Sequence, residues 1–487
     1  MVNETEKSSE GKRIIFHDIT AREAGQSPGD PTKSEVQVED KVRYILQYAI
    51  PSGVDAIEGF YPSSNDREFE GTQEVARYAK EHNIETAIVV LGRARTEDME
   101  RCWDAVKEAP HPRIHSYITL YKRGLDELVH MTFDDAVKTG CEAIQTAKRI
   151  SDGRAEVQFS IEHFGHCIDQ GADAIADAIV QFIDAGADII NMPNTVEKTR
   201  PNKFAGFVKD VVSRVKEKRP DSTTKFVVHC HNDFGMATAT AIACIETGLI
   251  DGVETATAPF LGERAGNTSM PEVAVTIDEN PEWYHTLNRE RIYDTAQAAG
   301  EIFHREVPPY APVVGGRIWE TTSGTHGRSA ENKDGKLGIY VPFKGKDYGC
   351  PPARVIFSSQ SGCDILSIIL NDIGYKEPPE RAKKVLSFAK ELAYTAANEA
   401  DKMEKLKVLG EAMGAFKEDM TEEAVRKRYQ EIMQEQGQGQ ACQPVRVAVA
   451  DGGKAPGREG KKVATGREAK NAATKAAVRE AFLGQGR

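Results

Sequence analysis

Eight short β-rich runs, most of them followed by a helical stretch, constrain the fold of this chain more than any other feature. Eight strand–helix alternations between residues 13 and 290 are what a closed parallel (β/α)8 barrel requires. An open, doubly wound sheet is the alternative, but no G-x-G-x-x-G sequence follows the first run. The sequence therefore predicts an α/β fold of the TIM-barrel type. The eight runs cover residues 13–18, 54–60, 86–92, 113–120, 155–160, 187–192, 225–230 and 252–257.

The pattern changes after the predicted barrel. A segment rich in Pro and Gly, "EVPPYAPVVGG" at 306–316, is typical of a linker. The sequence from about residue 361 has a helical pattern. Residues 451–487 hold 9 Lys or Arg against 4 Asp or Glu and few large apolar residues, which is typical of disorder. We expect five parts: a flexible N-terminus (1–12), a catalytic barrel (13–290), a linker and lid-like subdomain (291–350), a small helical C-terminal subdomain (351–434) and a disordered basic tail (435–487).

Bulk composition excludes several classes of protein. The chain has 487 residues, and its net charge of −12 argues against general nucleic-acid binding. It has no apolar run of about 18 residues, and its polar N-terminus does not resemble a secretory signal. The eight cysteines follow no framework spacing, so we expect reduced thiols. These features predict a cytoplasmic protein that binds neither membrane nor nucleic acid.

The stretch "FVVHCHND" places two histidines one residue apart at the end of the seventh run. Side chains alternate along a strand, so His229 and His231 face one side and Cys230 faces the other. Two imidazoles and one carboxylate, for which Glu23 after the first run is a candidate, could hold a divalent cation with open positions. Taken alone, a His-x-His pair is more often two polar residues where a strand ends, so the pattern by itself does not establish a metal site.

Four motifs then occur in one order: "DITAREAGQSPG" from Asp18, "HCHNDFGMATA" from His229, "GERAGNTSMPEV" from Gly262 and "SGTHG" from Ser323. Together they resemble the signatures of the 2-isopropylmalate synthase and homocitrate synthase family, the metal-dependent DRE-TIM barrel enzymes. The resemblance spans roughly residues 13 to 375. "AGQ" and "NTV" replace the family's "GEQ" and "DTV", and neither change removes a ligand.

The resemblance implies an acyltransferase. The family joins the methyl carbon of acetyl-CoA to the keto carbon of a 2-oxo acid and then hydrolyses the thioester. Such chemistry needs a base at the methyl group and positive charge where the keto oxygen becomes an alkoxide. A divalent metal (Mg, Mn, Zn or Co), acetyl-CoA as cosubstrate and a homodimer with shared active sites are implied. The alternative on the same barrel is a carbon–carbon lyase of the HMG-CoA lyase or aldolase type.

The resemblance also assigns roles to individual residues. Metal ligands are expected at Glu23, His229, His231 and Asn267. Catalytic residues are expected at Arg22, Glu162, His326 and Tyr340. Substrate contacts are expected at Gln26, Glu58, Leu91, His115, Gln158, Ser160 and Thr195.

The 2-oxo acid is left open. Homocitrate synthases have an Arg where this chain has Gln158, and a glutamine cannot form an ion pair with a second substrate carboxylate. This difference weakens a strict assignment as a homocitrate synthase. A dicarboxylic substrate such as 2-oxoglutarate or oxaloacetate is still an open alternative. Lys122 and Arg123 are candidates for the missing charge, with an exposed loop as the alternative. Residues 435–487 are too few and too polar for a leucine-sensing domain, so we expect no leucine feedback of that type.

Overall fold

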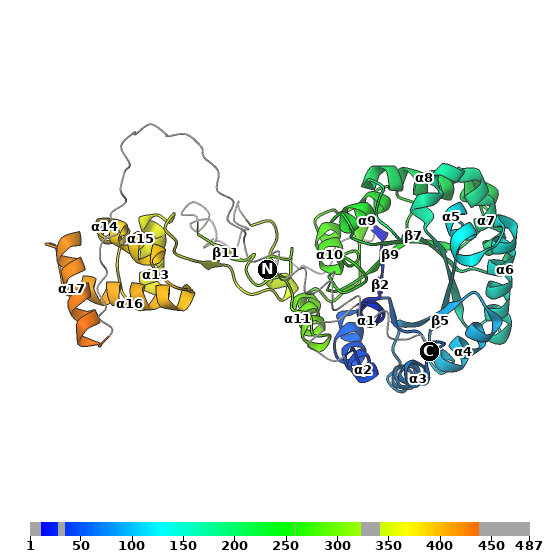
Figure 1. The fold of residues 1–487 in the computed structure, drawn as a ribbon, viewed down its shortest axis with the longest axis horizontal. Coiled ribbons are helices and arrows are strands. Elements are labelled where there is room, and N and C mark those ends of the chain that lie inside the picture. The colour runs from blue at the N-terminus through cyan, green and yellow to red at the C-terminus, as the bar shows by residue number, and fades with distance from the viewer. Residues whose placement is uncertain (1–10, 28–34, 259, 323–340, 438–487) are drawn as a thin grey trace, which may run out of the picture. The chain divides into compact units, whose positions relative to one another are not determined.

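The computed structural model describes residues 11–27, 35–258, 260–322 and 341–437. Eight parallel strands close into a barrel, in which the last strand pairs with the first (Figure 1). The predicted TIM-barrel fold is therefore confirmed, and each predicted run overlaps one strand. The strands are β2 (Ile15–Asp18), β3 (Ala56–Phe60), β4 (Ala87–Arg93), β5 (Pro112–Thr119), β6 (Glu156–Glu162), β7 (Ile189–Asn194), β8 (Lys225–Cys230) and β9 (Gly252–Thr255).

The strands are buried on both faces, which explains their nearly continuous apolar sequences. All six residues of β7 are buried, as are five of the six in β8. The register places His229 of β8 opposite Glu254 of β9, and Glu254 in turn opposite His17 of β2. Residues in register on neighbouring strands face the same side, so polar residues from three strands meet in one layer of the barrel.

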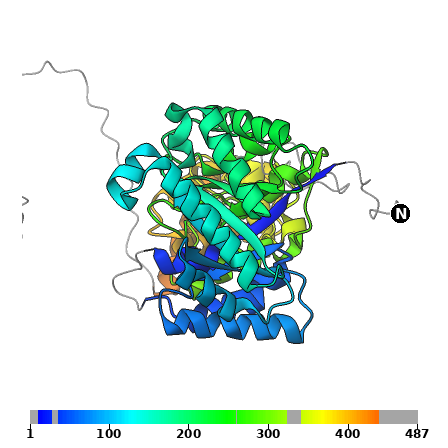
Figure 2. The same cartoon turned by 90° about the vertical axis from the view of Figure 1, so that its right-hand side faces the viewer.

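Helices surround the strands and cover the outer face of the barrel (Figure 2). On α6, for example, the buried residues recur every three or four positions and face the strands. The backbone of α6 comes so close at Gly140 that a β-carbon there would lie 2.6 Å from Phe182 and 2.8 Å from Phe159. The longer surrounding helices are α2 (Val38–Tyr44), α3 (Asp66–Glu81), α4 (Thr96–Val106), α6 (Phe133–Ile150), α7 (Ala172–Ala185), α8 (Pro201–Lys218), α9 (Ala237–Ile245) and α10 (Met270–Asp278).

Short helical turns follow several strands at their carboxyl ends. After β2 comes the helix α1 (Thr20–Gln26), which carries Arg22 and Glu23. After β5 come α5 (Lys122–Gly124) and the π-helix η3 (Leu125–Val129), and after β6 comes the 3-10 helix η4 (Phe164–Gln170). These turns form the rim around the carboxyl ends of the strands.

The barrel core continues beyond residue 290. The helix α11 (Ile292–Ile302) buries seven residues, and the hydrophobic cluster of the barrel includes its apolar side chains. Our prediction that a linker begins at residue 291 is therefore wrong, because α11 has an apolar face that packs against the barrel. The strand β10 (Trp283–Tyr284) pairs with β1 (Lys12–Arg13).

The C-terminal part is helical, as predicted, in the residues that the structure describes. A short parallel pair, β11 (Glu320–Thr321) and β12 (Arg354–Val355), precedes the helices. The chain divides into two compact units after Tyr429, within the last helix. These helices are α13 (Cys363–Asp372), α14 (Pro379–Lys384), α15 (Leu386–Tyr394), α16 (Glu399–Gly414) and α17 (Glu422–Glu435).

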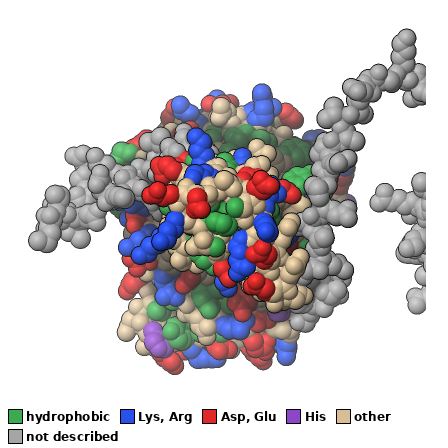
Figure 3. Space-filling view, turned by 90° about the vertical axis from the view of Figure 1, so that its left-hand side faces the viewer, with side chains coloured by type: hydrophobic (Ala, Val, Ile, Leu, Met, Phe, Trp, Pro, Cys, Tyr) green, Lys and Arg blue, Asp and Glu red, His purple; other side chains and the backbone are tan. Residues whose placement is uncertain are grey.

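Two predicted segments lie largely outside the described residues, namely the N-terminus 1–12 and the tail 435–487. None of the helices described in the structure has the length and apolar character needed to cross a membrane. On the face in Figure 3, acidic and basic side chains are interspersed. The seven cysteines in the described ranges carry free thiols.

Candidate active site

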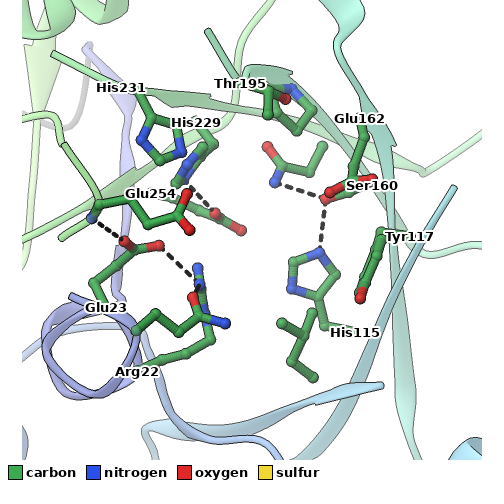
Figure 4. A pocket seen from close by; sticks show the side chains of 15 residues that line it. Arg22, Glu23, His115, Tyr117, Ser160, Glu162, Thr195, His229, His231 and Glu254 are labelled. Carbon is green, nitrogen blue, oxygen red and sulfur yellow. Dashed lines mark hydrogen bonds and ion pairs between the residues drawn. The ribbon is translucent and has the colours of Figure 1, made fainter. Parts of the chain in front are cut away.

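A cavity of about 200 Å³ opens where the barrel strands end (Figure 4). Its walls combine titratable and polar groups from α1 and from strands β4 to β9, with few apolar groups. This is the end of the barrel at which enzymes of this fold place their chemistry. The lining residues are Arg22, Glu23, Gln26, Leu91, His115, Tyr117, Ser160, Glu162, Asn191, Pro193, Thr195, His229, His231, Glu254 and Glu263.

Both histidines of the β8 pair line this cavity. Their ring centroids lie 4.8 Å apart, and each residue is 6% exposed. Cys230 between them is fully buried in the hydrophobic core, as strand alternation predicts. Burial and the neighbouring His229 lower the pKa of His231 to about 3. The ring of His231 is therefore neutral at pH 7, which is the form that binds metal ions.

Glu23 of α1 approaches Asn267 at a turn next to the histidines. The backbone of Asn267 bridges to that of His231. At Gly262, φ is +141°, and a β-carbon there would lie 2.3 Å from Nδ2 of Asn267 and 3.0 Å from Oε2 of Glu23. Glycine is required at this turn because any side chain would displace these two groups.

The charge of Glu23 is balanced by Arg22, the preceding residue on α1. Their side chains form an ion pair at 2.7 Å between Nη1 and Oε1. Burial alone would raise the pKa of Glu23, but Arg22 and the two histidines outweigh it and hold the pKa below its usual value. Within the described part of the chain, no three His, Cys, Asp or Glu side chains are arranged as a ready metal site. The assignment of Glu23, His229, His231 and Asn267 as metal ligands stays a prediction.

A chain of contacts crosses the barrel from Arg22. Nε of Arg22 donates to one carboxylate oxygen of Glu58, and Nδ1 of His115 lies 2.5 Å from the other. Nε2 of His115 lies 2.7 Å from Oγ of Ser160, which also accepts a hydrogen bond from Nδ2 of Asn191 at 2.9 Å. Glu58 is 0% exposed and does not line the cavity. Glu58 therefore contacts Arg22 and His115, which line the cavity, but does not line the cavity itself. This position does not fit our prediction that Glu58 contacts the substrate.

Gln158 also lies behind the cavity wall. Its Nε2 donates to Oε1 of Glu254, and its Oε1 accepts a hydrogen bond from Arg113 at 3.3 Å. Gln158 is fully buried and does not line the cavity. This position does not fit our prediction that Gln158 contacts the substrate. Lys122 and Arg123 do not line the cavity either. Both side chains are exposed, and they form ion pairs with Asp126 and Glu127, four residues further along the chain. Neither residue supplies the charge that Gln158 lacks.

Glu162 ends β6 at the cavity wall. Burial raises its pKa above the usual value, and the negative charge of Glu263 raises it further. Next to it, the backbone N–H of His163 donates to Oγ1 of Thr195 at 2.8 Å. His163 has a positive φ of 58°, a conformation that is uncommon outside glycine. The loops after β6 and β7 are thus joined beside Glu162.

The structure brings together ten predicted residues around one cavity, with Asn267 adjoining it through Glu23. Gln26 accepts a hydrogen bond from Arg22 at 2.6 Å, and Leu91 forms part of the apolar wall. His326 and Tyr340 lie outside the described residues, so their catalytic roles stay predictions. Sequence reasoning missed five lining residues: Tyr117, Asn191, Pro193 and Glu254 lie in strands, and Glu263 lies in the loop between β9 and α10.

The closed barrel and its polar cavity define a (β/α)8-barrel protein with its site at the carboxyl ends of the strands. The profile of the HMGL-like family matches residues 13–298. A 2-isopropylmalate synthase 2 from Leptospira interrogans is 31% identical over 398 residues, which are 81% of this chain and 89% of the relative. A 2-isopropylmalate synthase 1 from Caldanaerobacter subterraneus is 30% identical over 78% of this chain and 91% of its own length.

Among solved structures, the HMG-CoA lyase from Brucella melitensis covers 60% of this chain and 100% of its own, with 15% identity and a TM-score of 0.49. The profile match and the identity to the two synthases are extensive. This chain belongs to the HMGL-like family.

Proposed function

We propose that this protein is a metal-dependent acyltransferase of the 2-isopropylmalate synthase type. It joins the methyl carbon of acetyl-CoA to the keto carbon of a 2-oxo acid, and water then releases free CoA. The observation that carries this proposal is the shared cavity, which Arg22, Glu162, His229 and His231 all line. Two relatives at 31% and 30% identity are 2-isopropylmalate synthases, which supports the same reaction.

The residues next to α1 fit a divalent cation. Nδ1 of His231 and Oδ1 of Asn267 are buried and have no hydrogen-bond partner in the described structure. Buried polar atoms without partners are costly, and a cation would satisfy them. Glu23, His229, His231 and Asn267 would hold it. When bound, the metal would polarise the keto and carboxylate oxygens of the 2-oxo acid.

Arg22 is held in place for the growing charge. Glu23, Gln26 and Glu58 all bind its guanidinium, so the positive group is oriented before the substrate arrives. Preorganised charge of this kind stabilises a developing alkoxide without reorganisation. Glu162 takes the proton from the methyl carbon of acetyl-CoA, since a raised pKa makes its carboxylate a stronger base.

The cavity favours a short monocarboxylic acid. Of the lining residues, Arg22 alone carries a permanent positive charge, and we assign it to the reacting end. A second substrate carboxylate would meet Leu91, Tyr117 and Pro193 with no cation to pair with, and an unpaired buried charge is expensive. The volume of about 200 Å³ also suits a small ligand. We therefore propose a branched alkyl 2-oxo acid, 2-oxoisovalerate, as the preferred substrate.

A thiol-release assay with acetyl-CoA and a panel of 2-oxo acids tests this function. The panel is 2-oxoisovalerate, pyruvate, oxaloacetate and 2-oxoglutarate, each with Mg²⁺, Mn²⁺ or Zn²⁺. We expect the highest kcat/KM with 2-oxoisovalerate, at least about 100-fold above 2-oxoglutarate, because one unpaired charge costs a few kcal/mol. Chelation should abolish turnover and added metal should restore it.

Three results would contradict the proposal. Preference for 2-oxoglutarate would overturn the substrate assignment. Cleavage of HMG-CoA, with no thiol release from acetyl-CoA and any 2-oxo acid, would favour the lyase alternative. Full activity after complete removal of metal would exclude the proposed cation.

We further propose a homodimer in which His326 of one subunit completes the site of the other. This proposal rests on the resemblance of the "SGTHG" motif to that of the synthase family.

A further inference from the structure

Glu254 on β9 is a charged residue for which the proposed function has given no task. It is 1% exposed and lines the cavity beside His229 (Figure 4). The charge of a buried carboxylate must be balanced by its neighbours. The contacts of its two oxygen atoms therefore indicate what the residue does.

The neighbours of Glu254 come from three other strands. Oε2 lies 3.0 Å from Nδ1 of His229 on β8. Oε1 lies 3.4 Å from Nδ1 of His17 on β2 and accepts a hydrogen bond from Nε2 of Gln158 on β6. Protein groups thus approach both oxygens, and of these groups only the ring of His229 lines the cavity.

The strand register makes these contacts a fixed feature of the barrel. His229 and His17 are each directly opposite Glu254 in the two flanking strand pairs. All three side chains therefore face inward in one layer, and closure of the barrel prevents their strands from slipping. A carboxylate held this firmly can fix the orientation of a ring.

An imidazole that donates its Nδ1 proton to a carboxylate presents its other nitrogen as a free electron pair. This arrangement orients a metal-binding histidine and increases its basicity. We propose that Glu254 is a positioning residue of the metal centre, which holds His229 through Nδ1 so that the opposite nitrogen points at the cation. The inference rests on the proposed function, because it needs Glu23, His229 and His231 to bind a metal.

The test is the affinity of the full-length protein for Mn²⁺, measured from the electron paramagnetic resonance signal of the free ion. Glu254→Gln keeps the shape of the side chain and removes its charge. We expect it to weaken Mn²⁺ binding by about 10- to 100-fold, the usual effect of losing such a partner. His229→Ala should weaken binding at least as much, and adding Glu254→Gln to His229→Ala should cause no further loss.

A control separates positioning from stability. Asp278→Asn removes a buried carboxylate on α10 that binds His285, Arg289 and Tyr348 and does not line the cavity. It should lower the thermal unfolding midpoint while its Mn²⁺ affinity stays within twofold of wild type. A purely structural role of Glu254 would make the two variants behave alike.

The outcomes separate this inference from the proposed function. If wild type binds Mn²⁺ and Glu254→Gln binds it equally well, the positioning role is wrong and the function stands. If wild type binds no Mn²⁺, Zn²⁺ or Mg²⁺, the metal part of the proposed function fails and the inference fails with it. Should Glu254→Gln not fold, Glu254→Asp keeps the charge on a shorter arm. It should weaken binding, and wild-type affinity in that variant would overturn the inference.

Discussion

At the scale of single residues, the cavity gives two glutamates opposite protonation behaviour. Arg22 and the histidines hold the pKa of Glu23 below its usual value, although burial alone would raise it. Burial and Glu263 raise the pKa of Glu162. Environments that separate the pKa values of two carboxyl groups are typical of sites where one binds charge and the other transfers protons. This contrast supports the different roles that we propose for them.

Glu162→Gln tests the proton-transfer role. Glutamine keeps the size of the side chain but cannot accept a proton from the methyl carbon, so kcat should fall by about 10²- to 10⁴-fold. The measurement is steady-state thiol release, with circular dichroism to confirm folding. Glu127→Gln, on the exposed turn after β5, is a matched control that should retain wild-type kcat. A kcat for Glu162→Gln within threefold of wild type would exclude Glu162 as the base.

Sequence motifs identified the residues that sit on local patterns. That His229 and His231 lie on the same side of the strand could be predicted, because side chains alternate along a strand. Glu254 was missed because "GVETAT" carries no motif, although alignment of neighbouring strands would have placed it opposite His229. The contacts of Glu58 and Gln158 depend on side-chain packing across the barrel, which spacing along the chain does not encode.

At the scale of elements, apolar runs predicted all eight strands to within two residues at every end. The strands are buried on both sides, so their ends follow from composition and turn residues. The helix α1 was not predicted, because its seven residues include Gly25 and are too few for a clear periodicity. We assigned the residues of α11 to a linker because a Pro-rich stretch follows them. That stretch led us to place the start of the linker too early in the chain.

Close packing of α6 on the barrel gives a prediction at this scale. In Gly140→Ala, the added methyl group meets Phe159 and Phe182, whose rings are fully buried. Overpacking costs about 1–3 kcal/mol, which exceeds the gain of roughly 1 kcal/mol in helix propensity. We expect a lower free energy of unfolding in urea.

Gly206→Ala on α8 is the matched control for this prediction. A β-carbon there meets no atom within 4 Å, so the variant should be more stable than wild type by about 0.5–1 kcal/mol. If Gly140→Ala is stabilised to the same degree, the packing of α6 differs from that described.

At the scale of the whole molecule, a buried charge cluster joins the end of α10 to later segments of the chain. Asp278 binds His285, Arg289 and, through Tyr348, the 3-10 helix η6 (Gly345–Tyr348). Burial alone would raise the pKa of Asp278, but the hydrogen bonds from His285 and Arg289 outweigh it and hold the pKa well below its usual value. The ionised carboxylate therefore stabilises the folded state.

This shift predicts how stability depends on pH. A group whose pKa is lower in the folded state stabilises above its unfolded pKa of about 3.9, and that stability is lost as pH falls further. Asp278→Asn should lower the free energy of unfolding at pH 7 by about 1–3 kcal/mol. The difference between the two proteins should shrink below pH 4. A constant difference from pH 7 to pH 3 would exclude the charge as its cause.

The proposed sharing of sites between subunits is tested at the scale of the whole molecule. Glu162→Gln and His326→Ala should each be inactive alone. After equal mixing and subunit exchange, roughly a quarter of wild-type activity should return, because half of the dimers would each regain one intact site. Exchange can be followed with differently tagged subunits. Complete exchange without recovery would show that each subunit uses its own His326.

Glu58 has a consequence for how this enzyme could acquire new substrates. Its two oxygens bind Arg22 on one side and His115 on the other, so a mutation at His115 should also disturb the guanidinium that we propose binds the reacting end of the substrate. If selection favoured a 2-oxo acid with a different side chain, each substitution at His115 would then also reduce turnover. Leu91 and Pro193 lie on the wall without such a connection. Adaptive change in a laboratory evolution experiment should accumulate there first.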